Sequence, residues 1–320
     1  MERPMEDAST RPADPAAETA ATTDFETAHR QAFDAAGVEV TSHHLELEGP
    51  DVRMHVSEAG DATDDPPLLF VHGVLGYGAM FAPLVGRLPG THRLVLDRPG
   101  WGLSGDYRYA ASTHPQLAVD VLDGVLDAFD LDAVDLVGHS TGGHWSLRYA
   151  LARPGRVRRV IAVGGVPAIP GTSPPIPLRL YTMPGLARLL TPRGYPSEET
   201  VVKQLSMVGA AETIRDYPAL IDARIAHDRR SRVLPVGVSE LRSFTTLRRW
   251  RRAMQLSAAA VRRVEAPTTL VWGEEDLLGP PEAVRSLVAS MPEARLVTVS
   301  GGHIPWYGHP DTCAEVVSPD

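Results

Sequence analysis

The sequence is poor in cysteine and in long apolar runs, and it carries no excess of positive charge. A single cysteine, Cys313, excludes an internal disulfide and favours a reducing compartment. No apolar run approaches the ~20 residues of a membrane-crossing helix, and Met1–Asp24 has no apolar signal-peptide core. The net charge of −9 argues against non-specific nucleic-acid binding, which needs a basic surface. We therefore expect a cytoplasmic protein with no membrane span and no nucleic-acid partner.

Signals for cofactors and metals are also missing. No Gly-x-Gly-x-x-Gly pattern follows an expected strand, so we expect no dinucleotide site. The 12 histidines include no pair with zinc-type spacing and a third ligand, and His43 and His44 would face opposite sides of a strand. The sequence thus predicts a protein that works without a cofactor or a metal. Its hydrophobic content of 43% is normal for a globular chain.

What is present is an alternation of short apolar runs with helical segments, which predicts an α/β fold with a mostly parallel, doubly wound sheet. Six runs are typical of core strands: Leu68–Val71, Leu94–Leu96, Val134–Val137, Val160–Val163, Leu270–Trp272 and Leu296–Val299. Before them, Phe25–Ala35 has helical spacing, and Val38–Glu48 and Val52–Ser57 alternate as an antiparallel hairpin. Leu117–Phe129 supplies the helix before the third core strand.

The chain divides into a tail, a core in two parts and an insertion. Residues 1–24 are acidic and rich in alanine, threonine and proline, which predicts a disordered tail. The gap between the fourth and fifth core strands is too long for one crossover helix, so residues 167–263 form an insertion. Residues 25–166 and 264–320 then make up the two parts of the core.

The third core strand runs into Gly-His-Ser-Thr-Gly at residues 138–142 and then into a helical pattern. Gly-x-Ser-x-Gly at a strand-to-helix junction is a nucleophile elbow, in which glycines let the chain close around a strained serine. Ser140 is therefore the predicted nucleophile, and the Thr141 amide at the helix start can donate to an oxyanion. A His72-Gly73 pair after the first core strand predicts a second oxyanion amide, that of Val74.

Two further strand ends supply partners for the serine. Asp276 follows the strand at 270–272, with Glu275 as the alternative acid, and His303 follows the final strand, with His309 as the rival base. The order Ser140, Asp276, His303 is that of nucleophile, acid and base. All three lie at the carboxyl ends of expected parallel strands, the edge at which open sheets build their sites.

Together these motifs resemble the α/β-hydrolase family in its capped, single-domain form, from about Val38 to the C-terminus. The matching motifs are His72-Gly73, Asp97-Arg98-Pro99-Gly100-Trp101-Gly102-Leu103-Ser104, Gly138-His139-Ser140-Thr141-Gly142-Gly143, Gly273-Glu274-Glu275-Asp276 and Gly302-His303. The resemblance implies that Ser140, Asp276 and His303 act as a triad, with the two amides named above as the oxyanion hole. It also implies that the insertion is a helical cap and that the loop after the second core strand braces the oxyanion loop.

Several side chains near these motifs are candidates for lining a substrate pocket: His72, Gly73, His139, Trp101, Trp145 and Trp306. The early insertion is apolar and rich in proline, which with the tryptophans favours a hydrophobic acyl or aromatic substrate. The later insertion, Ser243–Arg263, shows a helical apolar stripe of Leu247, Trp250, Met254 and Val261. It also carries six arginines and no acidic residue, either as a solvated helix face or as a patch for an anionic substrate or partner.

We therefore predict a serine hydrolase that forms an acyl-enzyme, most specifically a carboxylic ester hydrolase whose partner is a small or medium hydrophobic ester or related acyl compound. Carbon–carbon bond hydrolases, acyltransferases and perhydrolases use the same triad and remain alternatives. A receptor that keeps the fold but binds a small molecule without turnover is the alternative of another class. The serine at position 140 argues against dehalogenase and epoxide hydrolase relatives, which need a carboxylate there.

Overall fold

The computed structural model describes residues 15–63, 65–183, 185–187 and 196–318. Its centre is an eight-stranded sheet with the spatial order β1-β2-β4-β3-β5-β6-β7-β8. Pairing is antiparallel from β1 to β2 and from β2 to β4, and parallel at every other junction. The strands are β1 Thr41–Glu48, β2 Asp51–Ala59, β3 Leu68–Val71, β4 Arg93–Asp97, β5 Val134–His139, β6 Val157–Val163, β7 Thr268–Gly273 and β8 Ala294–Val299. The predicted hairpin and the six predicted core strands are confirmed.

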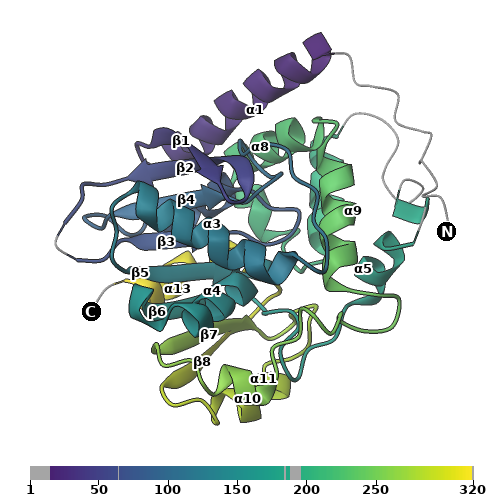
Figure 1. The fold of residues 1–320 in the computed structure, drawn as a ribbon. Helices are drawn as coiled ribbons and strands as arrows, with labels where there is room; N and C mark the ends of the chain where they lie inside the picture. Colours follow the sequence, from purple (N-terminus) through teal and green to yellow (C-terminus); the bar gives the residue numbers. More distant parts are fainter. Residues whose placement is uncertain (1–14, 64, 184, 188–195, 319–320) are drawn as a thin grey trace.

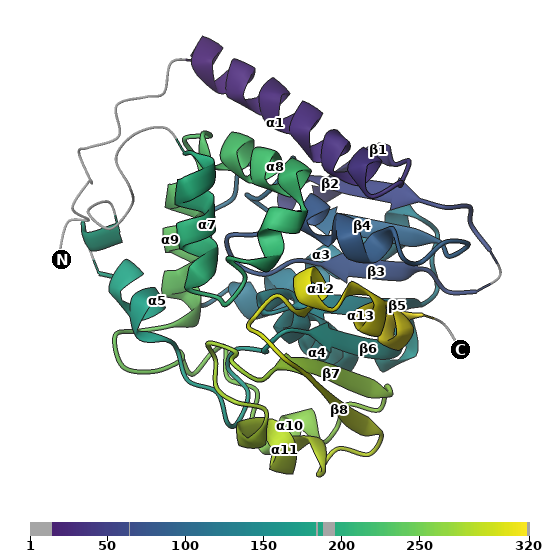
Figure 2. The same ribbon diagram turned by 180° about the vertical axis from the view of Figure 1, so that it is seen from behind.

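Helices cover both faces of this sheet. Figure 1 shows α3 and α4 in front of it, and Figure 2, from behind, shows α12 and α13 on the opposite face. The core helices are α1 Pro15–Ala35, α2 Ala82–Val85, α3 His114–Ala128, α4 Thr141–Ala152, α11 Glu282–Val288, α12 Pro305–Gly308 and α13 Pro310–Val317, with 3-10 turns η1 Gly78–Phe81 and η2 Pro154–Arg156. No helix in the described part of the chain has both the length and the apolar character to cross a membrane.

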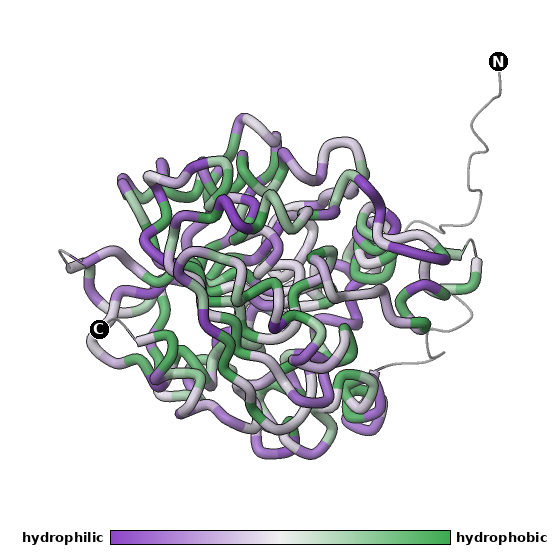
Figure 3. Tube along the Cα trace, turned by 90° about the horizontal axis from the view of Figure 1, so that it is seen from below, coloured by the Kyte–Doolittle hydropathy of each residue, from purple (hydrophilic) through white to green (hydrophobic). Residues whose placement is uncertain are grey.

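Each face of the sheet has its own apolar core, because successive strand residues point to opposite sides. In β3, Leu69 and Val71 pack in the cluster that contains α3 and α4 residues, whereas Leu68 and Phe70 pack in the cluster that contains α1 and α13 residues. Parallel strands covered on both faces are apolar throughout, which is why these runs were recognisable in the sequence. Figure 3 shows apolar segments passing through the middle of the molecule.

An insertion separates β6 from β7 and occupies residues 164–267. In Figure 1 its helices α5, α8 and α9 stand together beside the sheet. Its elements are α5 Ile176–Tyr181, α7 Glu198–Ser206, η3 Thr213–Asp216, α8 Pro218–Asp228, α9 Val233–Phe244 and α10 Ala258–Val261.

The predicted disordered tail is wrong for residues 15–24, which belong to α1; residues 1–14 lie outside the described residues. Pro15 stands in the first turn, where its missing N–H costs no hydrogen bond, and alanines with high helix propensity follow. Glu18 lies in the first turn, where its negative charge interacts favourably with the positive end of the helix dipole. Its carboxylate also accepts a hydrogen bond of 3.1 Å from the Ser231 N–H. α1 also lies along α8 (Figures 1 and 2), a contact that composition alone does not predict.

The single helical stripe predicted over Ser243–Arg263 is also wrong. α9 ends at Phe244, and an antiparallel bridge between Thr245 and Trp250 then turns the chain back on itself. The chain becomes helical again only in α10. Leu247, placed in the stripe by its spacing, is at the turn and exposed.

Replacing Phe25 by alanine tests how strongly α1 is held. The ring is fully buried, meets the Tyr77 ring at 5.3 Å and has the Arg230 guanidinium 5.0 Å from its centre. We expect Phe25→Ala to lower the free energy of unfolding by about 3–5 kcal/mol, the usual cost of emptying an aromatic site. Urea denaturation measures this loss, and exposed Gln31→Ala on the same helix is the matched control. Equal stability of the two variants would show that α1 is not part of the core.

Candidate active site

Ser140 stands alone between the end of β5 and the start of α4. Its φ of 52° and ψ of −113° are a conformation that non-glycine residues seldom adopt. The turn is tight, because a Cβ on Gly142 would strike the Val71 carbonyl oxygen and one on Gly138 would strike the backbone of the next helix turn. The glycine spacing of the sequence therefore produces the strained elbow that it predicted. The turn exposes the Ser140 hydroxyl to a cavity.

His303 and Asp276 form a hydrogen-bonded pair beside this cavity. The His303 Nδ1–H donates to Asp276 Oδ2 over 2.8 Å. The carboxylate also accepts the N–H groups of Gly165 and Leu278, each over 2.8 Å. Burial raises the pKa of Asp276, but His303 and these N–H donors outweigh it, so the pKa lies below its usual range. The acid thus stays ionised and fixes the proton of His303 on Nδ1.

The rival residues lie elsewhere. Glu275 is exposed, and the carboxylate that His303 bonds is that of Asp276. His309 interacts through its Nε2 with the Ser300 hydroxyl at 2.8 Å, at an exposed site outside the cavity lining. The geometry therefore pairs Asp276, and not its neighbour, with His303.

The loop after β3 brings a backbone N–H to the same place. Val74 donates its N–H to the Thr141 hydroxyl over 3.2 Å, so this amide points at the first residue of α4. His72 sets the loop: its Nε2 accepts the Arg98 N–H over 3.0 Å, which leaves the proton on Nδ1 to donate to the Gly73 carbonyl over 2.8 Å. Burial and the Arg98 charge lower the pKa of His72 to about 3, which keeps this tautomer neutral.

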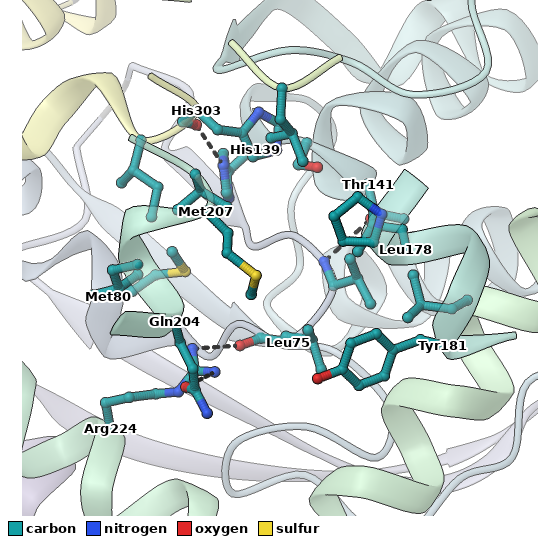
Figure 4. Close-up of a pocket in the computed structure, with 18 of the residues that line it drawn as sticks. Leu75, Met80, His139, Thr141, Leu178, Tyr181, Gln204, Met207, Arg224 and His303 are labelled. Atoms are coloured by element: carbon teal, nitrogen blue, oxygen red, sulfur yellow. Dashed lines mark hydrogen bonds between the residues drawn. The ribbon is translucent and has the colours of Figure 1, made fainter. Parts of the chain in front are cut away.

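One cavity of about 450 Å³ joins these groups. The core supplies Val74, His139, Ser140, Thr141 and His303 to its wall, and the rest comes largely from the insertion. Figure 4 shows Leu178, Tyr181 and Met207 facing the space around Thr141 and His303, together with Leu75 and Met80. The wall is mostly apolar. A hydroxyl, an imidazole with a fixed tautomer and backbone donors therefore meet in a water-poor space, which suits nucleophilic attack on a carbonyl.

The expected tryptophan lining is wrong. Trp101, Trp145 and Trp306 are fully buried and do not line the cavity. Each indole N–H instead donates to a partner at 2.7–3.0 Å, namely the Glu240 carboxylate, His114 Nε2 and the Met80 carbonyl. His72 and Gly73 likewise stay behind the wall, while His139 does line it and bonds the His303 carbonyl over 3.0 Å. An indole that is buried needs a partner for its N–H, and those partners come from distant segments.

Glu240 of α9 is a wall residue that the sequence analysis missed. Its two carboxylate oxygens accept from Arg98 at 2.7 and 3.3 Å, and one also accepts from Trp101 at 2.7 Å. Burial lowers the pKa of Arg98, but Glu240 more than compensates, so the net shift is upward. The sequence does contain a signal for this residue: Glu240 is the only acidic residue between positions 229 and 263, in a segment rich in arginine.

Arg224 of α8 is a second missed wall residue (Figure 4). Its guanidinium donates to Asp228 over 2.8 Å, to the Leu75 carbonyl over 3.1 Å and to the Gln204 amide oxygen over 3.2 Å. Burial lowers the pKa of Arg224 and the Asp228 charge raises it, with a net upward shift. The cation is thus balanced by its own neighbour and faces the cavity as part of a pair.

A buried cluster of His29, His55 and Asp97 holds ligand atoms within 4.8 Å of one another. Its carboxylate already accepts His55 Nδ1–H over 2.8 Å and the N–H groups of Gly78 and Leu103 over 2.6 and 2.9 Å. These bonds join β2, the loop after β4 and the turn that follows the Val74 loop. The carboxylate is thus satisfied by bracing these segments, whereas His29 Nε2 is buried 3.7 Å from Asp97 Oδ2 without a hydrogen-bond partner among the described residues.

Comparison with known proteins agrees with this architecture. Residues 68–316 match the alpha/beta hydrolase family, and the chain belongs to that family. It is 27% identical over 281 residues to a 2-hydroxy-6-oxononadienedioate/2-hydroxy-6-oxononatrienedioate hydrolase of Cupriavidus pinatubonensis, covering 84% of this chain and 90% of that one. The hydrolase of the same name from Dechloromonas aromatica is 26% identical, with 82% and 88% covered. The protein is accordingly an enzyme of the hydrolase class.

Solved structures share the fold at low identity. A 2-hydroxy-6-oxo-6-phenylhexa-2,4-dienoate hydrolase from a Rhodococcus strain superposes with a TM-score of 0.70 at 17% identity, covering 88% of this chain and 98% of that one. A carboxylesterase from Bacillus subtilis superposes with a TM-score of 0.65 at 18% identity, with 93% and 97% covered. Both carbon–carbon bond hydrolases and esterases therefore share this architecture.

Glu240→Gln tests the buried pair that joins the insertion to the loop after β4. The change leaves the Arg98 charge buried without a counter-charge, so we expect the free energy of unfolding to fall by about 3 kcal/mol. Exposed Glu212→Gln, also in the insertion, is the control. Replacing both Arg98 and Glu240 by methionine should recover much of the loss, since no unpaired charge then remains. A Glu240→Gln protein as stable as the control would mean that water reaches the pair.

Proposed function

We propose that the protein is a serine hydrolase with Ser140 as nucleophile, His303 as base and Asp276 as the acid that orients it. The observation that carries the proposal is the strained Ser140 elbow opening into the same cavity as the bonded His303–Asp276 pair. The insertion acts as a cap, because its helices supply most of that cavity's wall. The single thiol, Cys313, is buried, and we retain the cytoplasm as the location.

The reaction begins when His303 Nε2 takes the Ser140 proton and Oγ attacks the substrate carbonyl. The carbonyl π electrons move onto its oxygen, which the N–H groups of Val74 and Thr141 stabilise. The Val74 N–H gives up the Thr141 hydroxyl for this stronger acceptor. His303 then donates its proton to the leaving group as the carbon–oxygen bond breaks. Water, deprotonated by the same imidazole, releases the acid and restores Ser140.

A neutral, hydrophobic carboxylic ester is the substrate class that the cavity fits best. Its wall is mostly apolar, and its charged residues Arg224 and Glu240 are already paired, while Arg230 donates to the Gly102 carbonyl and lies over the Phe25 ring. Burying a substrate carboxylate beside Arg224 or Glu240 would require breaking one of these pairs or leaving a charge unpaired. The volume of about 450 Å³ suits a small or medium acyl group and its alcohol.

Carbon–carbon bond hydrolysis is the second candidate. The relatives from Cupriavidus and Dechloromonas carry the names of such enzymes, and their named substrates are dicarboxylates. Arg224 is the observation that favours it in this chain, because a buried guanidinium in the cavity wall can bind a carboxylate if Asp228 turns away. The two candidates share the elbow and differ in what the wall must hold.

The deciding assay compares p-nitrophenyl esters, from acetate to long-chain acids, with 2-hydroxy-6-oxo-dienoates that carry and lack a second carboxylate. We expect the esters to be turned over with an optimum at short or medium acyl chains. Ser140→Ala should lower kcat by roughly 10⁴ to 10⁶, as loss of a triad nucleophile does in other serine hydrolases. Ester turnover by Ser140→Ala at the wild-type rate would overturn the mechanism.

The same panel separates the two candidates. If the dienoates are turned over faster than every ester, and if Arg224→Met reduces their turnover, the reaction is carbon–carbon bond hydrolysis. Faster turnover of esters, with Arg224→Met retaining it, would assign the esterase. The matched variant is Arg229→Met, an exposed arginine directly after the last residue of α8. It controls for the loss of a positive charge in this region.

Asp276→Asn tests the acid directly and separates it from its neighbour. The amide cannot hold the Nδ1 proton of His303 as a carboxylate does, so the ring can adopt the wrong tautomer. We expect kcat to fall by roughly 10³ to 10⁴, by analogy with serine proteases. Exposed Glu275→Gln should change kcat less than about twofold, since a surface charge is largely screened by water and salt. The reverse pattern would make Glu275 the acid.

A further inference from the structure

Among the residues that the structure describes, the exposed large hydrophobic side chains all lie in the insertion. The large hydrophobic residues that are exposed in the described part of the chain are Ile176 (68%), Leu180 (36%), Met183 (36%), Met207 (55%) and Leu247 (52%). Three of them lie on or just after α5, whose other side chains Leu178 and Tyr181 line the cavity. One short helix thus has an apolar face toward the cavity and an apolar face toward solvent. A group of this kind on a water-soluble surface marks an interaction site.

Arginines gather beside these apolar residues. Arg179 lies on α5, Arg242 on the last turn of α9, and Arg248, Arg249, Arg251 and Arg252 lie in and after the turn that follows. Among the described residues none of these six has a carboxylate within ion-pair distance. The neighbouring sequence offers few carboxylates. Glu240 is the only acidic residue from 229 to 263, and it is buried against Arg98. A chain with a net charge of −9 therefore has a local positive surface here.

Hydrogen bonds join the two segments into one surface. Arg242 Nε donates to the Thr182 carbonyl over 3.0 Å, and the Trp250 indole donates to the Thr172 carbonyl over 3.1 Å. Arg251 Nε donates to the Arg242 carbonyl over 2.5 Å. Figure 1 shows α5 beside α9 on the same side of the molecule. We call this surface the rim patch; it comprises Ile176, Arg179, Leu180, Met183, Arg242, Leu247, Arg248, Arg249, Arg251 and Arg252.

We infer that the rim patch binds an anionic phospholipid surface. Exposed apolar side chains insert among acyl chains, and flanking arginines contact anionic headgroups, the combination by which proteins lie on membranes without crossing them. Both parts are needed, because a soluble anion or a uniformly acidic polymer gives the apolar side chains nothing to enter. The patch shares α5 with the cavity wall, so a hydrophobic substrate dissolved in the membrane has a short way to Ser140. This surface role does not depend on the proposed reaction.

The test measures co-sedimentation of the full chain with phosphatidylglycerol vesicles and with phosphatidylcholine vesicles. Ser140→Ala is used throughout, so that no lipid is cleaved and binding is read apart from catalysis. We expect binding to phosphatidylglycerol to be at least ~10-fold tighter than to phosphatidylcholine and to weaken as salt rises. Equal binding to both vesicles, or none to either, would overturn the inference.

Two variants locate the surface. Replacing Arg248, Arg249, Arg251 and Arg252 by glutamine should weaken vesicle binding at least ~10-fold, given about 1 kcal/mol for each basic residue at such a surface. The matched control replaces four exposed arginines elsewhere: Arg30, Arg53, Arg285 and Arg295. Thermal melting checks folding, and the smaller change Arg248→Gln with Arg249→Gln avoids the Arg251 bond. Full binding by either rim variant would place the lipid contact elsewhere.

Substitutions of the apolar residues of the rim patch distinguish binding to a membrane from binding to an acidic polymer. Leu180→Ser with Leu247→Ser should weaken vesicle binding several-fold and leave binding of soluble polyglutamate unchanged. If polyglutamate binds as tightly as the vesicles and this variant binds both normally, the rim patch takes an acidic polymer and the inference fails. In an active background, the four-arginine variant should keep its turnover of a soluble short-chain ester and lose turnover of an ester held in anionic vesicles.

Discussion

The close approach of α4 to the end of β3 is the constraint on which the rest of the site depends. It leaves no room for a side chain at Gly142 and forces Ser140 to a φ of 52°. Such a backbone costs of order 1–3 kcal/mol and persists only where its surroundings fix it. The parallel pairing of β5 with β3 and β6 provides that fixation. The first residue of the helix, Thr141, then accepts the N–H of Val74, so the strained turn also sets the position of the two amides that we propose as oxyanion donors.

Buried charges hold the loops around this turn, and the principal ones are satisfied by partners from distant parts of the chain. Asp97 joins β2 to the turn at Gly78, and the Arg98 backbone sets the tautomer of His72 in the loop after β3. The Arg98 side chain reaches Glu240 in the insertion. Buried ion pairs add little net stability, since desolvation offsets their attraction. Their effect here is geometric: the loop after β3 and helix α9 of the insertion are fixed to the same two adjacent residues.

Short sequence patterns predicted those features that depend on neighbouring residues in the chain. The bounds of β3 follow from prolines and a run of four apolar residues, and the elbow follows from two glycines around one serine. The remainder required tertiary information. Residues 15–24 extend a helix whose later turns are buried, which their own acidic composition does not reveal, and the indole of Trp101 turns from the cavity because Glu240 accepts its N–H. The prediction of a helical stripe after Ser243 was wrong because the bridge between Thr245 and Trp250 interrupts the helix there.

Charge is distributed differently inside the cavity and on the rim. Inside, the Arg224 guanidinium donates to Asp228, Gln204 and a carbonyl, so a carboxylate of the protein itself balances its charge. On the rim, arginines stand beside exposed leucines with no carboxylate close by among the described residues. The outside of the insertion therefore carries arginines beside apolar side chains, while the cavity wall inside is mostly apolar. An amphiphile with an anionic head and a neutral ester in its chain would satisfy both surfaces at once, with the head held at the rim and the ester carried toward Ser140.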